Sequence, residues 1–585
     1  MFTQVTTDTG LTWQPALSPK GDMVAYASDR EGDGNLDIWV QRTFGGAPVR
    51  LTNHVADDVE PAFSPDGAKV LFRSERDGGG VYAVPVTGGE ARKIADGGRR
   101  PRYSPDGKWI AYWAGNRPHL AGQVYVVSAE GGRPRSLLDP SAAVRSPVWT
   151  PDGKHLLVAG RFHGHREGEL PTDVPNVDWY IVSLDGGPTV RTGALQAFEQ
   201  AGLSAPGGVP WRFYPDVWLP EKNEVIFSAI LGNSTNLWRI SISPRTWKIG
   251  GQPQRLTSGT GLESYSSVSS GGILALSSLT SNHGIWSLPV DADRAKVTGA
   301  IQPLTRNASD DFAPSISADG KKLAFESFRT GERLVWTKDL ASGREAALTD
   351  APSGEALPRI TADGSRVAFS IFPVGIAGAS LAGDIYVIPF IGGQPGKVCE
   401  RCGYAWGWSP DSTKLLYGTG KSMSVLDVDS GRNHTILEAP GYWFWSGRFS
   451  WDARWISFVG TIAFPRIPDT SPGPAVTRFR DGVQLSKEGW IQMTEGGHQL
   501  WSPDGTRVYS ASRRDGLLCL WSSRLNPETK QPIGSPQPVH HLHRARFSLP
   551  DDPDWLGLTV ARDKIVFSLR ELTGNIWIAT SRPAQ

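Results

Sequence analysis

The stretch VEPAFSPDGAKVLFRS, residues 59–74, has the pattern of a strand, a tight turn and a second strand. In such a turn proline presets the first corner, aspartate accepts hydrogen bonds from nearby amides, and glycine adopts positive φ at little steric cost. Val70, Leu71 and Phe72 follow the turn as an apolar run, which suits a strand that is covered on both faces. The stretch therefore predicts a β-hairpin that packs between two neighbouring layers.

This turn recurs along the whole chain. Clear copies occupy residues 18–21, 64–67, 104–107, 150–153, 317–320, 361–364, 409–412 and 502–505, and weaker copies lie near Pro220, Gly271, Asp452 and Asp563. Twelve copies at a spacing of roughly 40 to 70 residues fall in the range of propellers and related arrays.

Each unit continues in the same way after its hairpin. A third strand carries an aromatic residue, as at Ile285-Trp286 and Ile576-Trp577, and a glycine turn such as Gly45-Gly46 follows in several units. A short fourth strand, such as residues 303–305, then ends the unit. Four antiparallel strands per unit are typical of a propeller blade.

The two chain ends indicate how the blades close. The last unit stops after its third strand at residues 575–578, whereas residues 2–6 resemble a fourth strand without a unit of its own. Ring closure by such a strand removes an exposed sheet edge. We predict an all-β fold of two tandem six-bladed β-propellers with twelve four-stranded blades, residues 1–299 and 300–585, each closed by an N-terminal fourth strand. A split into seven and five blades fits the same count.

In wording and spacing, the repeat resembles the WD-like propeller repeat of TolB-type proteins, over almost the whole chain. Similar arrays form the C-terminal propeller regions of bacterial serine/threonine kinases and also occur beside peptidase domains. The resemblance implies a sensor role and a periplasmic or other extracytoplasmic location. The residues themselves leave the compartment open, and also whether a longer chain carries a kinase or a membrane anchor.

The composition narrows the range of partners. Lys and Arg total 60 and Asp and Glu total 59, so no overall charge attracts nucleic acid or an anionic membrane. No apolar run reaches the roughly 18 residues of a membrane span, and the first ten residues lack the pattern of a signal peptide. We therefore expect a protein or peptide partner, no nucleic acid and no membrane span, with the oligomeric state left open.

Candidate binding residues lie in the loops opposite the uniform turns, because variable loops on a rigid scaffold often carry function. The charged candidates are Arg30, Asp58, Glu60, Arg76, His163, His165, Asp311, Arg329 and Arg513. An arginine that follows a serine recurs among them, and it can either pair with an acidic residue of the adjoining loop or contact an anionic or peptide partner. Trp211 and Trp443 are candidate anchors for a partner, with packing between blades as the alternative.

Metal and catalytic motifs are weak. Cys399 and Cys402 have the spacing of a redox motif or a zinc clip, but only Cys519 remains as a further cysteine, and three cysteines cannot build a disulfide framework. Histidine pairs at residues 163/165 and 541/543 also lack further ligands. We predict no cofactor, no metal site and no catalytic residue, while a structural cation such as calcium near a propeller axis cannot be placed.

The leading hypothesis is a non-catalytic binding or sensor scaffold that recognises a protein, peptide or small ligand at the propeller funnels, and not an enzyme. The alternative is a propeller hydrolase or lyase whose site is assembled from several blades in one funnel. Its candidates are Asp58, Arg76, His163 and His165 in the first ring and Asp311, Arg329 and Arg513 in the second. A third hypothesis is a structural subunit of a larger assembly.

Overall fold

The computed structural model describes residues 2–32, 34–117, 121–139, 142–162, 177–206, 213–307, 309–350, 357–372, 383–462, 473–493, 497–512, 514, 518–542, 546–550 and 556–580. Within these ranges the strands form nine four-stranded sheets and one twelve-stranded sheet. The described part of the chain has a single α-helix, α1 (Ala194–Gln200). The predicted all-β class with four-stranded antiparallel units is confirmed.

The N-terminal half supplies four separate sheets and part of the large one. The separate sheets are β2 (Thr12–Leu17), β3 (Met23–Ser28), β4 (Asp37–Arg42), β5 (Val49–Arg50); β6 (Asp58–Phe63), β7 (Lys69–Ser74), β8 (Gly80–Pro85), β9 (Arg92–Asp96); β10 (Arg99–Tyr103), β11 (Trp109–Arg117), β12 (Ala121–Ser128), β13 (Arg135–Ser136); and β14 (Ala143–Trp149), β15 (His155–Arg161), β16 (Val177–Ser183), β17 (Val190–Arg191). The large sheet begins with β18 (Pro215–Leu219), β19 (Glu224–Leu231), β20 (Ser234–Ile242), β21 (Ile249–Arg255) and β22 (Leu262–Val268).

The C-terminal half supplies five separate sheets. They are β26 (Asp311–Ile316), β27 (Lys322–Ser327), β28 (Leu334–Asp339), β29 (Glu345–Ala347); β30 (Arg359–Ile360), β31 (Arg366–Ile371), β32 (Asp384–Pro389), β33 (Gly396–Cys399); β34 (Tyr404–Trp408), β35 (Lys414–Gly418), β36 (Ser422–Asp427), β37 (Asn433–Glu438); β38 (Tyr442–Phe449), β39 (Trp455–Ile462), β40 (Gly473–Arg478), β41 (Ile491–Gln492); and β42 (Leu500–Trp501), β43 (Arg507–Ser512), β44 (Cys519–Leu525), β45 (Pro532–His540).

The remaining strands complete the twelve-stranded sheet. They are β1 (Phe2–Gln4), β23 (Leu274–Asp291), β24 (Lys296–Val297), β25 (Gln302–Pro303), β46 (Phe547–Ser548), β47 (Thr559–Val560) and β48 (Lys564–Ala579).

The repeated turn forms because its polar groups satisfy one another locally. In the copy at residues 64–67, the Gly67 amide donates to the Ser64 carbonyl at 2.8 Å, and Asp66 Oδ1 accepts from the Ala68 amide at 3.0 Å. The Ser64 hydroxyl donates to Asp66 and accepts from the Lys69 amide. Gly67 has a φ of 74°, in the left-handed region that favours glycine. This turn therefore joins two strands without an unpaired group at the corner.

The first strands of successive sheets contact one another in two closed circles. One circle runs through β2, β6, β10, β14, β18 and β22 and returns to β2, and we call it the first ring. The other runs through β26, β30, β34, β38, β42 and β47 and returns to β26, and we call it the second ring. Buried apolar side chains fill the space between neighbouring sheets, as Ile38 and Val40 do against Phe72 and Val84.

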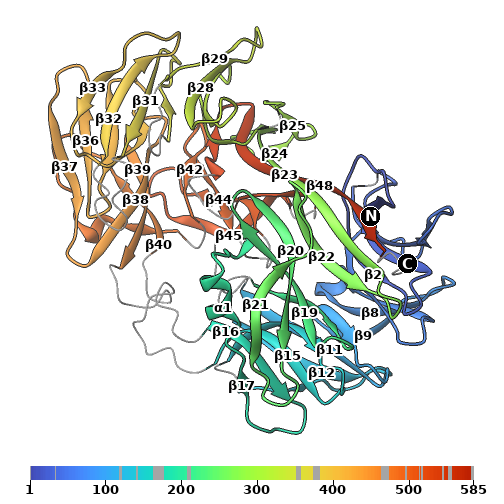
Figure 1. Cartoon of the computed structure of the whole chain (residues 1–585). Coiled ribbons are helices and arrows are strands. Elements are labelled where there is room, and N and C mark those ends of the chain that lie inside the picture. Colours follow the sequence, from blue (N-terminus) through green and yellow to red (C-terminus); the bar gives the residue numbers. More distant parts are fainter. Residues whose placement is uncertain are drawn as a thin grey trace.

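Two long strands, β23 and β48, run antiparallel to each other and connect the two rings (Figure 1). Their pairing is continuous from Leu274 with Ala579 to Pro289 with Lys564. The start of β23 pairs with β22 of the first ring, and the end of β48 pairs with β1. At the opposite end of the pair, β48 pairs with β47 of the second ring and β23 with β25.

This pairing differs from the strand assignment expected from the repeat. Ile285-Trp286 was expected in the last blade of the first ring, yet Trp286 pairs with Pro303 in the sheet that ends in β25. Trp577 was expected in the second ring, yet it pairs with Gln4 beside the first ring. The N-terminal strand therefore closes a sheet as predicted, but the two units have exchanged their third strands.

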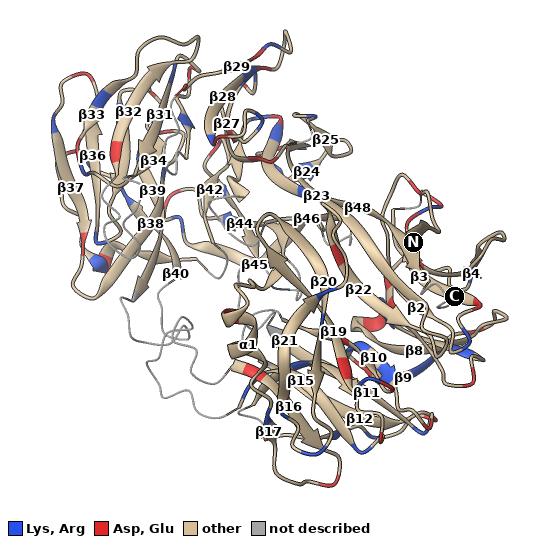
Figure 2. Ribbon diagram, viewed as in Figure 1, with Lys and Arg blue, Asp and Glu red and all other residues tan. Residues whose placement is uncertain are grey.

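Basic and acidic residues are interspersed over both groups of sheets, as expected from the balanced composition (Figure 2). None of the helices within the described ranges has the length and apolar character that a membrane-spanning helix needs.

Candidate functional site

The first strands of the second ring enclose a cavity of about 150 Å³. Each of the six strands contributes the residue that lies two positions before its turn: Ser315, Arg359, Gly407, Arg448, Leu500 and Thr559. The rest of the lining is mainly apolar and includes Trp406, Trp408, Phe449, Trp451 and Trp501. The cavity therefore combines two guanidinium groups with an aromatic wall, and its residues come from six separate sheets.

Main-chain carbonyl groups hold the two arginines in place. The side chain of Arg359, a residue that is only 6% exposed, donates from Nε to the Trp406 carbonyl and from Nη1 to the Pro358 carbonyl, both at 3.0 Å. Arg448 donates from Nη1 to the Gly447 carbonyl at 2.9 Å. Since a guanidinium group presents its donors in one plane, such anchoring fixes the orientation of that plane.

Gly407, between these two arginines, leaves room for the stem of Arg448. A Cβ atom added at Gly407 would lie 3.1 Å from the Gly447 oxygen and 3.2 Å from Arg448 Cδ. These distances are tighter than ordinary van der Waals contact, so a larger residue would displace the arginine.

His498 lies just before β42, where the positive charges of both arginines act on its imidazole. Burial, together with the positive charges of Arg448 and Arg359, lowers the pKa of His498 to about 3. The imidazole is therefore neutral near pH 7 and can accept a proton. An anion bound beside the two arginines would offset their charge and raise this pKa toward the ordinary value for histidine.

The centre of the first ring is filled by a chain of polar contacts. The Glu60 amide donates to Gln14 Oε1 at 2.8 Å, and the Arg100 amide donates to Glu60 Oε2 at 2.5 Å. Arg100 Nη1 lies 3.3 Å from Asp216 Oδ1, and the guanidinium lies over the rings of Tyr214 and Tyr265 at 5.2 and 5.1 Å. Gln14, Glu60, Arg100, Asp216 and Tyr265 come from five of the six first strands, and their contacts tie these strands together.

Backbone bulges turn these side chains inward. Gln14, Glu60, Arg100 and Tyr265 have φ values of 55°, 58°, 48° and 54°, and each lies at a register shift of its first strand. A bulge bends a strand and redirects a side chain at the cost of a strained backbone. The strain recurs at one level of the ring, where polar side chains meet.

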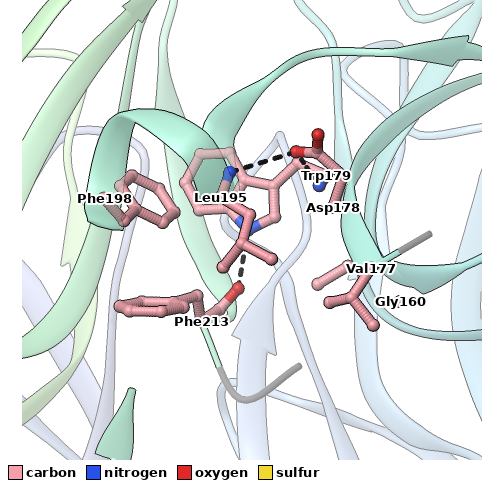
Figure 3. A pocket seen from close by; sticks show the side chains of 8 residues that line it. Gly160, Val177, Asp178, Trp179, Leu195, Phe198 and Phe213 are labelled. Atoms are coloured by element: carbon pink, nitrogen blue, oxygen red, sulfur yellow. Dashed lines mark hydrogen bonds between the residues drawn. The ribbon is translucent and has the colours of Figure 1, made fainter. Parts of the chain in front are cut away.

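A second, much smaller cavity of about 10 Å³ lies under α1 (Figure 3). Asp178 Oδ1 accepts from the amides of Trp179 and Leu195, and Trp179 Nε1 donates to the Phe213 carbonyl at 2.6 Å. A space of this size holds at most about one water molecule, so these residues form a packed structural unit rather than a ligand site.

Three of the predicted arginines lie in ion pairs with acidic residues at or shortly before the start of the first strand of their own sheet. Arg30 contacts Asp8 at 2.6 Å, and its guanidinium also lies over Tyr26 and Trp39. The other two pairs are Arg76 with Asp58 at 2.6 Å and Arg329 with Asp311 at 3.2 Å. This is the structural role that the sequence allowed for the arginine after serine.

The two remaining predicted residues that the structure describes, Glu60 and Trp443, lie in different rings. Glu60 belongs to the polar chain of the first ring, and Trp443 stacks on Trp445 at 5.7 Å on β38 of the second. His163, His165, Trp211 and Arg513 lie outside the described residues.

The described ranges contain no group of three or more His, Cys, Asp or Glu side chains that could hold a metal ion. Cys399 and Cys402 form a disulfide bond with each other. Cys519 is buried in β44.

Arg359 and Arg448 were missed because they lie beside the turns, which were interpreted as purely structural. His498 lies in the loop before β42, opposite the turns, and was not singled out. A signal was present, since Arg359 and Arg448 stand two residues before a turn, where Ala16 and Ala62 stand in other units. A long charged side chain at this position can bind neighbouring main-chain carbonyls, as Arg102 does in the first ring, or reach a ligand at the ring centre.

The fold defines an all-β protein of the β-propeller type. Residues 2–161 match the family model of the TolB beta propeller domain, which confirms the resemblance drawn from the repeated turn.

Comparison with curated proteins adds a relative described as an uncharacterized peptidase, YuxL of Bacillus subtilis (strain 168). It is 42% identical over 76 residues, which are 13% of this chain and 11% of the relative, so the chain matches only a small part of that protein. Among solved structures, TolB from Acinetobacter baumannii is 13% identical with a TM-score of 0.33, covering 62% of this chain and 83% of that chain. The tricorn protease is 13% identical with a TM-score of 0.32, covering 91% and 63%.

The prediction of a non-catalytic scaffold, and with it the statement that the chain is not an enzyme, is wrong on this comparison. The matched relative is described as a peptidase, so the hypothesis of a hydrolase or lyase is the better one. The search for local motifs failed for a physical reason, because side chains from separate blades can meet at a propeller centre without any contiguous signature.

Proposed function

We propose that the two rings are six-bladed β-propellers that share β23 and β48. The closed circles of first strands and the four-strand units support this arrangement. The first propeller would then comprise residues 2–281 with residues 572–579, and the second residues 282–571. This refines the predicted division at residue 300, which remains a prediction.

We propose that the protein is a hydrolase acting on peptide bonds, with its active site in the cavity of the second ring. The observation that carries the proposal is the convergence of Arg359 and Arg448, from two different sheets, at one cavity, with His498 close enough that the charges of both arginines act on it. The peptidase description of the curated relative supports the choice of peptide over other substrates.

In this proposal His498 is the general base. The neutral imidazole takes a proton from a water molecule as the water oxygen bonds to the carbonyl carbon of the peptide. The C–N bond then breaks, and the imidazolium returns the proton to the departing amine nitrogen. An anionic substrate between the arginines would offset their part in the low pKa of His498, which makes the imidazole a stronger base when the site is occupied.

The test is a cleavage screen by mass spectrometry with a mixed peptide library. The wild-type protein is expected to cleave peptides, and His498→Gln to do so roughly 10²- to 10⁴-fold more slowly, as is typical for loss of a general base. His54→Gln serves as the matched control, because His54 lies in the loop after β5 of the first ring. Absence of cleavage by the wild type, or full activity of His498→Gln, would overturn the proposal.

We further propose that the protein works outside the cytoplasm. The disulfide between Cys399 and Cys402 supports this, since such bonds persist in oxidising compartments. Thiol alkylation in intact cells tests it, because a cytoplasmic protein would react at both cysteines.

A further inference from the structure

We propose that the cavity of the second ring receives the C-terminal residue of a peptide, with the carboxylate between Arg359 and Arg448 and an apolar side chain against the tryptophans. The inference names the substrate end that the proposed peptidase would bind, and so it rests on that function.

The two arginines suit a carboxylate better than a neutral group. Both guanidiniums reach the same cavity from β30 and from β38, and each is oriented by main-chain carbonyls rather than by solvent. A planar guanidinium matches a carboxylate with two parallel hydrogen bonds. Two such groups on either side of Gly407 create a positive potential, which adds to the larger effect of burial in lowering the pKa of His498.

The rest of the cavity suits an apolar side chain. Trp406, Trp408 and Phe449 supply flat apolar surface, and Ile316, Ile360 and Val560 complete it. A volume of about 150 Å³ is comparable to an engineered apolar cavity known to bind benzene, so one side chain of moderate size fits.

The lining also argues against an acidic sugar as the ligand. A sugar ring carries several hydroxyl groups, and each buried hydroxyl needs a hydrogen-bond partner. Apart from the two arginines and the indole N–H groups of the tryptophans, Ser315 and Thr559 are the only polar side chains among the lining residues that the structure describes. An apolar amino-acid side chain makes no such demand.

A chain end is favoured over an internal segment because only the C-terminal residue carries a free α-carboxylate beside its side chain. The two arginines and the apolar wall of the one cavity match these two groups.

The experiment measures binding to the His498→Gln variant, so that turnover does not interfere. The probes are the acetylated peptides Ac-Ala-Ala-Ala-Xaa, with Xaa as Ala, Leu, Phe, Asp or Lys, each with a free C-terminal carboxylate and as the amide. Calorimetry gives the affinity, and tryptophan fluorescence reports the cavity. We expect the Leu or Phe acid to bind about tenfold to a hundredfold more tightly than its amide, the factor that corresponds to charged hydrogen bonds.

Arg359→Met and Arg448→Met, each in this background, are expected to remove the preference for the acid. Arg102→Met is the matched control, since Arg102 holds the corresponding position of the first ring, and its preference should persist. If a methionine variant melts at a lower temperature than its parent, Arg359→Lys is used instead, because it keeps the positive charge. This variant is expected to retain part of the preference for the peptide acid over its amide.

Equal binding of acids and amides, binding of no peptide, or binding of galacturonic acid instead would overturn the inference. These results are distinguishable from failure of the proposed function. If His498→Gln cleaves as fast as wild type while acids are still preferred, the anchor for the carboxylate stands and the assignment of the base falls.

Discussion

The two rings place arginine at the same level, two residues before the turn, and use it differently. In the first ring Arg102 donates to the Pro101 carbonyl and lies beside a centre crossed by the Glu60, Arg100 and Asp216 contacts. In the second ring Arg359 and Arg448 face a cavity of about 150 Å³. The difference teaches that residues facing the centre of such a ring can either stabilise the contacts between its strands or line a cavity for a ligand.

The largest effect is expected from removing residues 572–585. The first ring would lose the end of β48, which pairs with both β23 and β1, whereas the second ring would keep residues 564–571. Two exposed sheet edges would follow, so the first ring should unfold while the second retains its sheets. Hydrogen exchange measured by mass spectrometry resolves the two rings.

Removal of residues 581–585 alone is the control and should leave exchange unchanged. Equal protection of the first ring in both truncated forms would show that the shared strands do not hold it.

The next effect concerns the charge at the centre of the first ring. Asp216→Ala leaves Arg100 buried without this partner and should cost about 3–5 kcal/mol of unfolding free energy. The volume-conserving change His498→Gln in the second ring should cost about 1.5 kcal/mol or less. Urea unfolding measures both, and similar costs would remove the contrast between a locked and an open centre.

Acid should act on the second ring through His498. Burial and the nearby arginines lower its pKa to about 3, so between pH 6.5 and 3 the unfolded chain binds a proton that the folded chain does not. Stability therefore falls as pH decreases through this window, by up to about 1.4 kcal/mol per pH unit. The wild type should lose more stability than His498→Gln between pH 7 and pH 4.5, and parallel curves would contradict this.

The smallest effect compares one turn from each ring. Asp363 accepts from Thr361 Oγ1, the Ser365 amide and Ser365 Oγ, whereas Asp66 accepts from Ser64 Oγ and the Ala68 amide. Burial opposes these bonds at Asp363, yet they lower its pKa to about 2. Asp363→Asn should cost about 1 kcal/mol more than Asp66→Asn near pH 7, since that is the usual value of one hydrogen bond.

Because the folded pKa of Asp363 is depressed, this stabilisation is complete above pH 4 and is lost as pH falls toward 2. Chemical unfolding at pH 7 and at pH 2.5 measures the loss. A difference that persists at the lower pH would mean that charge has no part in it.

The sequence predicted the repeated unit well and its candidate site poorly. A Ser-Pro-Asp-Gly turn is held by bonds within six residues, as between Ser64 and Lys69, so its pattern is legible in one short stretch. For the arginine that follows a serine, the sequence allowed either an ion pair or contact with a partner, and Arg76 forms the ion pair with Asp58. Arg359, Arg448 and His498 are separated by 139 residues from first to last and share no local pattern.

The amino-acid sequence by itself determined the four-stranded units and the turns between their strands, because these depend on contacts between near neighbours. Only the tertiary structure decided which third strand joins which ring. Ile285-Trp286 and Ile576-Trp577 have the same apolar and aromatic character, so either could fill either place. The continuous pairing of β23 with β48 selected one arrangement. The side chains that meet at each ring centre then determined that the first centre is filled by polar contacts and that the second encloses a cavity.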